Sequence, residues 1–464
     1  MARILLAIVL FFAIEDPTVW SGVVELPGGT KLEFSVELKK DSGTISIPMQ
    51  GAKDMPLSGV SVTDKELKFS IPEVGASWEL AIADDGQTAT GVLRQGAELK
   101  TTMTRLAAGE APAKELVRPQ EPKPPFPYDA HEVEFDSAGG TLAGTLTVPR
   151  GEGPFPCVVM VSGSGPQDRD EALMGHRPFL VIADHLTRHG IAVLRYDDRG
   201  VGKSTGSFEK ATSDDFAEDA LAAVAFLGLR KEIDDLKIGI VGHSEGGLIA
   251  PICAAGSKDV AFIVLLAGTG ITGWELMPIQ GKLIGIASGV PPDEAERQAK
   301  ASAEIFALVM AGKSDREVRE AIRVAIGNEI DTAPETKDLP RAERKKKADE
   351  MAEQQSSALL SPWFRRFLVM DPRENLKKVT CPVLALNGEK DLQVPPKENL
   401  SEIEKALKAA GNKDVTCLEL KGLNHLFQTC KTGAPSEYAE IAETFSPMAL
   451  EAMTSWIRKR TGLD

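Results

Sequence analysis

The sequence has few cysteines, and no two of them stand in the CxxC spacing of zinc sites and redox centres. The five are Cys157, Cys253, Cys381, Cys417 and Cys430, and most of them lie in or beside apolar runs. Cysteines in such surroundings are typical of small core residues. The odd number also leaves at least one outside any intrachain disulfide. We therefore expect neither a disulfide framework nor a zinc site.

The N-terminal region lacks an apolar run long enough to span a bilayer, which takes about 20 residues. The run at residues 4–14 follows Arg3 and has the length of a signal-peptide h-region, although no small-x-small cleavage site follows it. We expect residues 1–16 to be a signal or another apolar segment, with no stable membrane span. The protein is then exported to the periplasm or out of the cell. The alternative is a first strand or a mis-assigned start, with a cytoplasmic protein.

Positive charge is also in short supply. The 53 Lys and Arg residues face 68 Asp and Glu residues, which gives a net charge of −15. This balance repels nucleic acid and anionic lipid headgroups, so we expect no nucleic-acid partner. The hydrophobic fraction of 42% and the charged fraction of 26% are those of ordinary soluble domains, and they exclude disorder, collagen and coiled coil for the whole chain.

Short apolar-periodic runs separated by Gly- and Asp-rich turns predict a small all-β domain at residues 17–107. Its expected strands are residues 31–36, 44–48, 66–71, 78–82, 89–93 and 98–103. Six of the 29 prolines then fall between positions 112 and 127, which predicts a stiff linker at residues 108–127.

After the linker, continuous apolar runs alternate with helical sequence, which predicts a parallel sheet covered by helices at residues 128–464. The expected buried strands are residues 157–161, 191–196, 238–241, 262–266 and 383–386. Between about 270 and 372 the strand signal gives way to alanine- and charge-rich helical sequence. We expect an inserted helical cap there, with the basic run at residues 341–347 on a solvated helix face.

The segment Gly-His-Ser-Glu-Gly-Gly at residues 242–247 joins one of these strands to a helical segment. In this context G-x-S-x-G marks a sharp turn that exposes a serine, here Ser244. A serine nucleophile needs a histidine base and an orienting carboxylate. His425 follows the expected strand 416–420, and Asp391 follows the strand 383–386. The chain order Ser244, Asp391, His425 is that of α/β-hydrolases; Glu389 is the rival acid.

The loop after the first core strand, Val-Ser-Gly-Ser-Gly-Pro at residues 161–166, supplies candidates for the oxyanion hole. We expect the backbone N–H of Glu245 to act together with that of Ser164 or Gly165. The alternative is a structural Gly-rich turn. Gln167, Asp168 and Arg169 either brace this loop or contact substrate.

Three segments together resemble a bacterial α/β-hydrolase family of carboxylesterases, whose members are often described as serine aminopeptidase-like. They are residues 163–171 (GSGPQDRDE), 196–204 (YDDRGVGKS) and 242–247 (GHSEGG). The resemblance covers about residues 128–464 and implies the same triad of Ser244, Asp391 and His425. Residues 50–53 and 71–78 resemble the small β-domain that precedes some of these esterases.

We therefore expect an α/β fold and a serine carboxylesterase acting through an acyl-enzyme on small esters of short to medium acyl chains. A serine peptidase, a thioesterase and a binding protein on a hydrolase scaffold are the alternatives. The cap aromatics Trp363, Phe364 and Phe367 are the candidate lining of the acyl pocket, although their spacing also suits a core stripe. The chemistry needs no cofactor and no metal. His185 and His189 share a helix face but lack a third ligand.

Overall fold

The computed structural model describes residues 18–25, 31–47, 52–95, 98–107, 118–332, 336 and 339–463. The chain divides into two compact units, Met1–Leu116 and Val117–Asp464. The apolar segment expected at residues 1–16 lies outside the described residues. Within these described ranges, no helix is both long enough and apolar enough to cross a membrane.

The first unit is the small all-β domain that the sequence predicts. Its strands form one antiparallel sheet in the order β4-β3-β2-β1-β9-β8-β7-β6-β5. The strands are β1 (Thr18–Glu25), β2 (Lys31–Leu38), β3 (Gly43–Ile47), β4 (Ala52–Pro56), β5 (Ser58–Val62), β6 (Glu66–Ile71), β7 (Ala76–Ile82), β8 (Thr88–Arg94) and β9 (Glu98–Arg105). The core includes Phe34, Phe69 and Trp78, with the Phe69 and Trp78 rings stacked at 5.1 Å.

None of the strands predicted from the sequence corresponds to β1, β4 or β5, and the structure explains why β1 has a weak sequence signal. β1 contains Gly22, which packs under the ring of Phe34 from the neighbouring strand. A Cβ at position 22 would lie 2.2 Å from the Phe34 Cζ atom. The glycine that weakens the strand signal in the sequence is therefore required by a contact across the sheet.

The second unit is built on a mostly parallel sheet in the order β10-β11-β13-β12-β14-β15-β16-β17. β10 and β11 are antiparallel, and β12 to β17 run parallel to one another. The strands are β10 (Tyr128–Ser137), β11 (Gly140–Pro149), β12 (Phe155–Val161), β13 (Ala192–Tyr196), β14 (Ile233–His243), β15 (Phe262–Leu266), β16 (Val383–Gly388) and β17 (Val415–Leu420). Each expected core strand is present.

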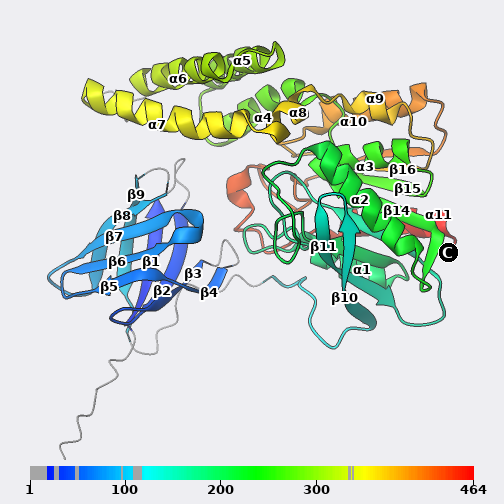
Figure 1. The fold of residues 1–464 in the computed structure, drawn as a ribbon, viewed down its shortest axis with the longest axis horizontal. Helices are drawn as coiled ribbons and strands as arrows, with labels where there is room; N and C mark the ends of the chain where they lie inside the picture. The colour runs from blue at the N-terminus through cyan, green and yellow to red at the C-terminus, as the bar shows by residue number, and fades with distance from the viewer. Residues whose placement is uncertain are drawn as a thin grey trace, which may run out of the picture. The chain divides into compact units, whose positions relative to one another are not determined.

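Helices cover both faces of this sheet (Figure 1). The helices α1 (Pro178–Arg188) and α11 (Pro447–Thr461) pack on one face. The helices α2 (Ser213–Gly228), α3 (Glu245–Gly256) and α10 (Pro396–Ala409) pack on the other. β12 is buried on both faces, because Val158 and Met160 join the first set of helices while Val159 and Val161 join the second. A continuous apolar run is the sequence pattern of such a strand.

The helical cap leaves the sheet after β15 and returns before β16. Its helices are α4 (Gly273–Ala287), α5 (Pro292–Met310), α6 (Asp315–Thr332), α7 (Arg341–Leu359) and α8 (Pro362–Val369), followed by the short α9 (Pro372–Leu376). They enclose a separate apolar core, with Val318, Ile322 and Ile326 of α6 one turn apart on its buried face. This spacing places them along one side of the helix.

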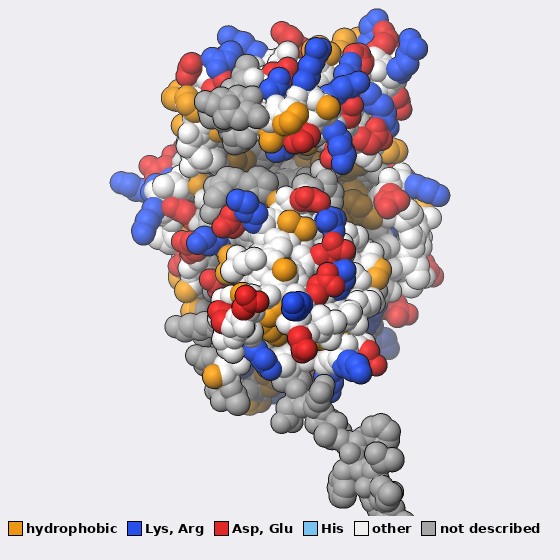
Figure 2. All heavy atoms as spheres, turned by 90° about the vertical axis from the view of Figure 1, so that its left-hand side faces the viewer, with side chains coloured by type: hydrophobic (Ala, Val, Ile, Leu, Met, Phe, Trp, Pro, Cys, Tyr) orange, Lys and Arg blue, Asp and Glu red, His pale blue; other side chains and the backbone are white. Residues whose placement is uncertain are grey.

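The outer surface of the cap carries both signs of charge. Arg319 of α6 pairs with Glu353 of α7 at 2.8 Å, and Arg344 pairs with Asp331 at 2.9 Å. Figure 2 shows acidic and basic side chains interspersed over the upper helices. The basic run at residues 341–347 therefore forms part of a mixed, solvated surface.

The segment predicted as a linker divides between undescribed and packed residues. Residues 108–117 lie outside the described part, and residues 118–127 belong to the second unit. The buried guanidinium of Arg118 donates to the carbonyl oxygens of Met174, Gly175, Ala439 and Ile441. One side chain thus joins the start of this unit to two of its loops.

Replacing Arg118 with Ala should destabilise the second unit by about 3 kcal/mol, because the carbonyl groups lose a charged donor while remaining largely buried. Arg118→Lys keeps the charge and three donors and should lose less. Chemical denaturation of the full chain measures the change. Arg150, whose side chain is 61% exposed, provides the control, and Arg150→Ala should stay within about 0.5 kcal/mol of the parent. An Arg118→Ala protein as stable as the parent would contradict this role.

Candidate active site

Ser244 stands on a sharp turn between β14 and α3. Its backbone has φ 53° and ψ −113°, a strained combination for a residue with a side chain. The Ser244 N–H donates to the Leu266 carbonyl at 2.8 Å, which ties the turn to β15. The structure therefore has the strand-turn-helix geometry that the G-x-S-x-G pattern predicts.

The glycines around Ser244 allow the tight approach of α3 to the sheet. A Cβ at Gly242 would lie 2.0 Å from the Gly246 carbonyl oxygen, and one at Gly246 would lie 2.1 Å from the Val161 carbonyl oxygen. Both are backbone contacts that no rotamer change can relieve. The two glycines of the motif are thus required by packing.

Asp391 and His425 meet at the same edge of the sheet. His425 Nδ1 lies 2.8 Å from Asp391 Oδ2, and both side chains are buried. Asp391 Oδ1 accepts the backbone N–H groups of Gln393 and Val394 at 2.8 and 2.9 Å. These donors fix the carboxylate as an acceptor, so the proton belongs on His425 Nδ1 and leaves Nε2 to accept.

The rival acid Glu389 lies elsewhere, because its carboxylate accepts the backbone N–H of Gly422 at 2.8 Å. The structure therefore brings Asp391, and not Glu389, to His425. Within the described residues, the Ser244 hydroxyl makes no hydrogen bond to His425. Such contacts are often long in the absence of substrate.

The predicted oxyanion loop passes directly beside the serine. A Cβ on Gly163 would lie 3.2 Å from the Ser244 Cβ. The Gly163 N–H already has an acceptor, because it donates to Glu171 Oε1 at 2.7 Å. The backbone N–H groups of Ser164, Gly165 and Glu245 have no protein acceptor within the described part of the chain. These are the three backbone donors that the sequence predicts as candidates for the oxyanion hole.

The side chains after this loop brace it. Arg169 makes two hydrogen bonds to the Asp197 carboxylate, at 3.0 and 2.8 Å. Asp168 accepts the N–H groups of Asp170 and Ala172 at 3.0 Å each. Gln167 donates its side-chain amide to the Ser164 carbonyl at 3.3 Å. Of the two alternatives left by the sequence, these contacts favour bracing over substrate contact.

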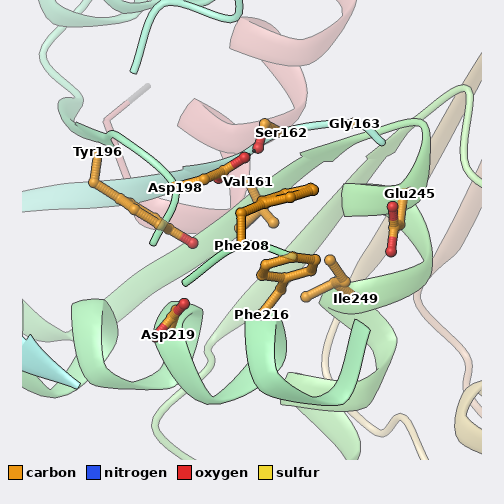
Figure 3. A pocket seen from close by; sticks show the side chains of 10 residues that line it. All are labelled: Val161, Ser162, Gly163, Tyr196, Asp198, Phe208, Phe216, Asp219, Glu245 and Ile249. Atoms are coloured by element: carbon orange, nitrogen blue, oxygen red, sulfur yellow. Dashed lines mark hydrogen bonds between the residues drawn. The ribbon is translucent and has the colours of Figure 1, made fainter. Parts of the chain in front are cut away.

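A small pocket lies behind the loop, and Asp198 forms one wall of it (Figure 3). Asp198 Oδ1 accepts from the Ser162 hydroxyl and Oδ2 from the Gln167 N–H, both at 2.9 Å. Burial raises the pKa of Asp198 to about 8, and the nearby carboxylates of Glu171 and Glu245 add to the effect. This carboxyl therefore holds a proton near neutral pH.

The Glu245 side chain has a role that sequence reasoning missed, because only its backbone N–H entered the prediction. Its buried carboxylate accepts from the Ser213 hydroxyl at 2.6 Å and from the Trp363 Nε1–H at 2.7 Å. Burial raises its pKa, although these bonds and the Ser164 hydroxyl oppose the shift. Glu245 thereby links the turn at Ser244 to the cap.

The three candidate aromatics of α8 occupy different places. Trp363 reaches Glu245 and stacks on Phe367 with ring centroids 5.5 Å apart. Phe367 packs against Leu248 and Leu276 beneath the cap. Phe364 turns into the cap's own core, where its ring lies 5.7 Å from that of Phe306. Trp363 is therefore the one that contacts the residue next to Ser244.

The two helical histidines form no metal centre. The His185 and His189 rings lie 4.4 Å apart on α1, and His189 Nδ1 contacts the His185 carbonyl oxygen at 2.7 Å. No group of three or more His, Cys, Asp or Glu residues among the described positions is arranged to hold a metal ion.

Comparison with sequence families decides the class of the chain. Residues 177–429 match the hydrolase family described as "Serine aminopeptidase, S33". The chain belongs to this family. The matched region runs from the start of α1 past His425 and includes the helices between β15 and β16, and the α/β-hydrolase fold is that of the family.

The similarity to individual proteins is limited either in the length of the match or in sequence identity. The chain is 37% identical over 160 residues to Esterase EstD of Thermotoga maritima, a match that spans 34% of this chain and 38% of that protein. An esterase structure from Pyrococcus furiosus is 16% identical, covers 72% of this chain and 91% of its own, and has a TM-score of 0.42. The α/β-hydrolase GrgF from a Penicillium species is 19% identical, with coverages of 72% and 99% and a TM-score of 0.43.

The protonated state of Asp198 predicts a pH-dependent stability. In the unfolded chain Asp198 has the ordinary aspartate pKa of 3.8, whereas in the native state its pKa is about 8. Asp198 therefore loses its proton at a lower pH when the chain is unfolded. The native state therefore binds more protons between these values, and its stability falls as pH rises through them, by at most about 1.4 kcal/mol per pH unit.

Asp198→Asn should remove this contribution, because an amide has no proton to lose. Thermal unfolding at pH 6 and pH 9 should show a smaller loss for Asp198→Asn than for the parent. Asp235 is exposed, so Asp235→Asn should keep the parent's pH dependence. The same dependence in all three proteins would refute the assignment.

Proposed function

We propose that the protein is a serine carboxylesterase that hydrolyses small esters of short to medium acyl chains. The 2.8 Å contact between His425 and Asp391, at the sheet edge where Ser244 stands on its strained turn, carries the proposal. A histidine oriented by a buried carboxylate, at the same sheet edge as a half-buried serine, is the arrangement that activates a hydroxyl for acyl transfer.

In this mechanism the Ser244 Oγ attacks the ester carbonyl carbon while His425 Nε2 takes its proton. The tetrahedral intermediate collapses, and His425 returns the proton to the departing alcohol. Water then attacks the acyl-enzyme by the same route and releases the carboxylic acid. Asp391 holds the imidazole in the required tautomer and balances the charge that it gains.

The developing oxyanion would be met by the backbone N–H of Glu245 together with that of Ser164 or Gly165. The lack of protein acceptors for these groups supports the assignment. Each such donor is worth about 10²- to 10³-fold in rate. Gly163 is unsuited to the role because Glu171 already takes its N–H.

An ester is a better substrate proposal than a peptide. An aminopeptidase must bind the free ammonium group of its substrate through a carboxylate near the nucleophile. The carboxylate next to Ser244 belongs to Glu245, and Ser213 and Trp363 already donate to it. The named activity of the relative EstD, an esterase, agrees with the proposal.

Ser244→Ala should lower turnover of p-nitrophenyl acetate by at least about 10⁴-fold, because no other group supplies the nucleophile. Labelling by a fluorophosphonate probe should be lost as well. Ser207 is exposed in the same unit, and Ser207→Ala should leave both readouts at the parent's level. The parent should also hydrolyse the ester faster than an aminoacyl p-nitroanilide. Full ester turnover by a folded Ser244→Ala protein would overturn the proposal, and a preference for the anilide would indicate a peptidase.

We further propose that Trp363 limits the acyl pocket. Trp363→Ala should raise the rate on p-nitrophenyl octanoate relative to acetate by about tenfold, since a removed ring leaves room for added methylenes. Trp363→Phe removes the bond to Glu245 but keeps most of the ring volume, so it helps to separate the effect of the bond from that of the volume. Trp274 is a partly exposed indole of α4, so Trp274→Ala is the control. An unchanged chain-length profile in Trp363→Ala would exclude Trp363 from the pocket.

A further inference from the structure

Glu171 and His243 form a buried contact next to the turn at Ser244. His243 Nδ1 lies 2.9 Å from Glu171 Oε1, and His243 Nε2 lies 3.0 Å from the carbonyl oxygen of His425. The same Glu171 oxygen accepts the Gly163 N–H at 2.7 Å. Neither side chain has a place in the mechanism above, although both are almost fully buried.

We propose that His243 is held as an imidazolium by Glu171, and that this buried ion pair positions the oxyanion loop and the His425 loop around Ser244. The proposal rests on the esterase function proposed above, because it names positioning residues for that reaction. Glu171 and His243 touch no substrate in this scheme and act through Gly163 and His425.

Hydrogen-bond accounting leads to the charge of His243. A carbonyl oxygen can only accept, so the contact with His425 places a proton on His243 Nε2. A carboxylate can also only accept, so the contact with Glu171 places a second proton on Nδ1. An imidazole with both nitrogens protonated is a cation. A neutral His243 beside an ionised Glu171 would leave one of its two contacts without a proton.

The surrounding charges favour the same state. Burial alone lowers the pKa of His243, but the charge and hydrogen bond of Glu171, the His425 carbonyl and the charge of Asp391 together raise it above its ordinary value. The other titratable neighbour is the His425 imidazole, whose ring centroid lies 4.9 Å away. The small pocket beside the pair is otherwise lined by apolar side chains, among them Phe179, Leu266 and Phe445, and such surroundings screen charges weakly.

The pair joins the three segments that carry the proposed chemistry. Gly163 precedes the candidate oxyanion donors, His243 precedes the nucleophile, and the third contact is made by the backbone of the base itself. A shift of one segment would therefore displace the other two. Loss of the pair should loosen the relative placement of donor, nucleophile and base, which affects the rate more than substrate binding.

Glu171→Gln tests the charge with little change of shape. The amide oxygen can still accept the Gly163 N–H, but a neutral His243 then cannot donate to both remaining partners. We expect Glu171→Gln and His243→Gln each to lower kcat on p-nitrophenyl acetate by about tenfold or more, with KM changed less than about threefold. The double variant should be no worse than the more damaged single variant, because the two residues act as one unit.

Nitrogen-15 spectra of the histidine-labelled parent provide a readout independent of activity. One of the six histidines should have both ring nitrogens protonated from pH 6 to pH 9, and its signals should vanish in His243→Gln. His131→Gln, at an exposed position of β10, should keep the signals and the parent kinetics. Because the spectrum is taken on the parent, the result stands even if a variant fails to fold.

The outcomes separate this inference from the function. A neutral His243 in the spectrum, or parental kcat in both single variants while Ser244→Ala is inactive, would overturn the ion pair and leave the esterase proposal intact. Absence of esterase activity in the parent together with a doubly protonated His243 would overturn the function and leave the pair.

Discussion

The sharp turn at Ser244 is the constraint on which the rest of the catalytic unit depends. The turn exists because α3 approaches the sheet so closely that Gly246 lies against the Val161 carbonyl and Gly247 against Gly268. Any side chain at these positions would push α3 away from β12 and β15. The same approach aims the first N–H of the helix, that of Glu245, beside the serine. Packing of glycines against backbone thus sets both the strain of the serine and the position of a candidate oxyanion donor.

Buried acids near this turn are kept in different states by their partners. Asp391 receives backbone N–H groups and an imidazole, so it is stabilised as a charge. Asp198 has two neutral donors and carboxylate neighbours, and its raised pKa keeps its proton. Arg169 compensates Asp197 with a two-bond ion pair. Because an unpaired buried charge is expensive, each of these three aspartates has its own set of partners, and of the three it is Asp391 that contacts a histidine.

Sequence patterns predict the elements of this fold whose physics is local. Continuous apolar runs marked the buried parallel strands, and the strand-glycine-serine-glycine order placed Ser244 on its turn. The contact of Asp391 with His425 followed from chain order and strand ends. The pair of Glu171 and His243 could not be found in this way, because the contacts of His243 with Glu171 and with the His425 carbonyl join segments far apart in sequence. The same holds for Arg118, whose carbonyl partners give no sequence signal.

The cap has its own apolar core and is joined to the sheet below it through polar contacts of α8. Its helices bury an apolar core of their own, and Leu276 and Phe367 join a second buried cluster with Leu248 of α3. Polar contacts tie α8 to the unit below: Trp363 donates to Glu245, and Arg366 pairs with Asp214 of α2. Glu245 belongs to the turn, so the cap is attached at the residue next to Ser244. A change in the cap's aromatic residues can therefore alter the space above Ser244 while the glycine contacts that set the turn stay in place.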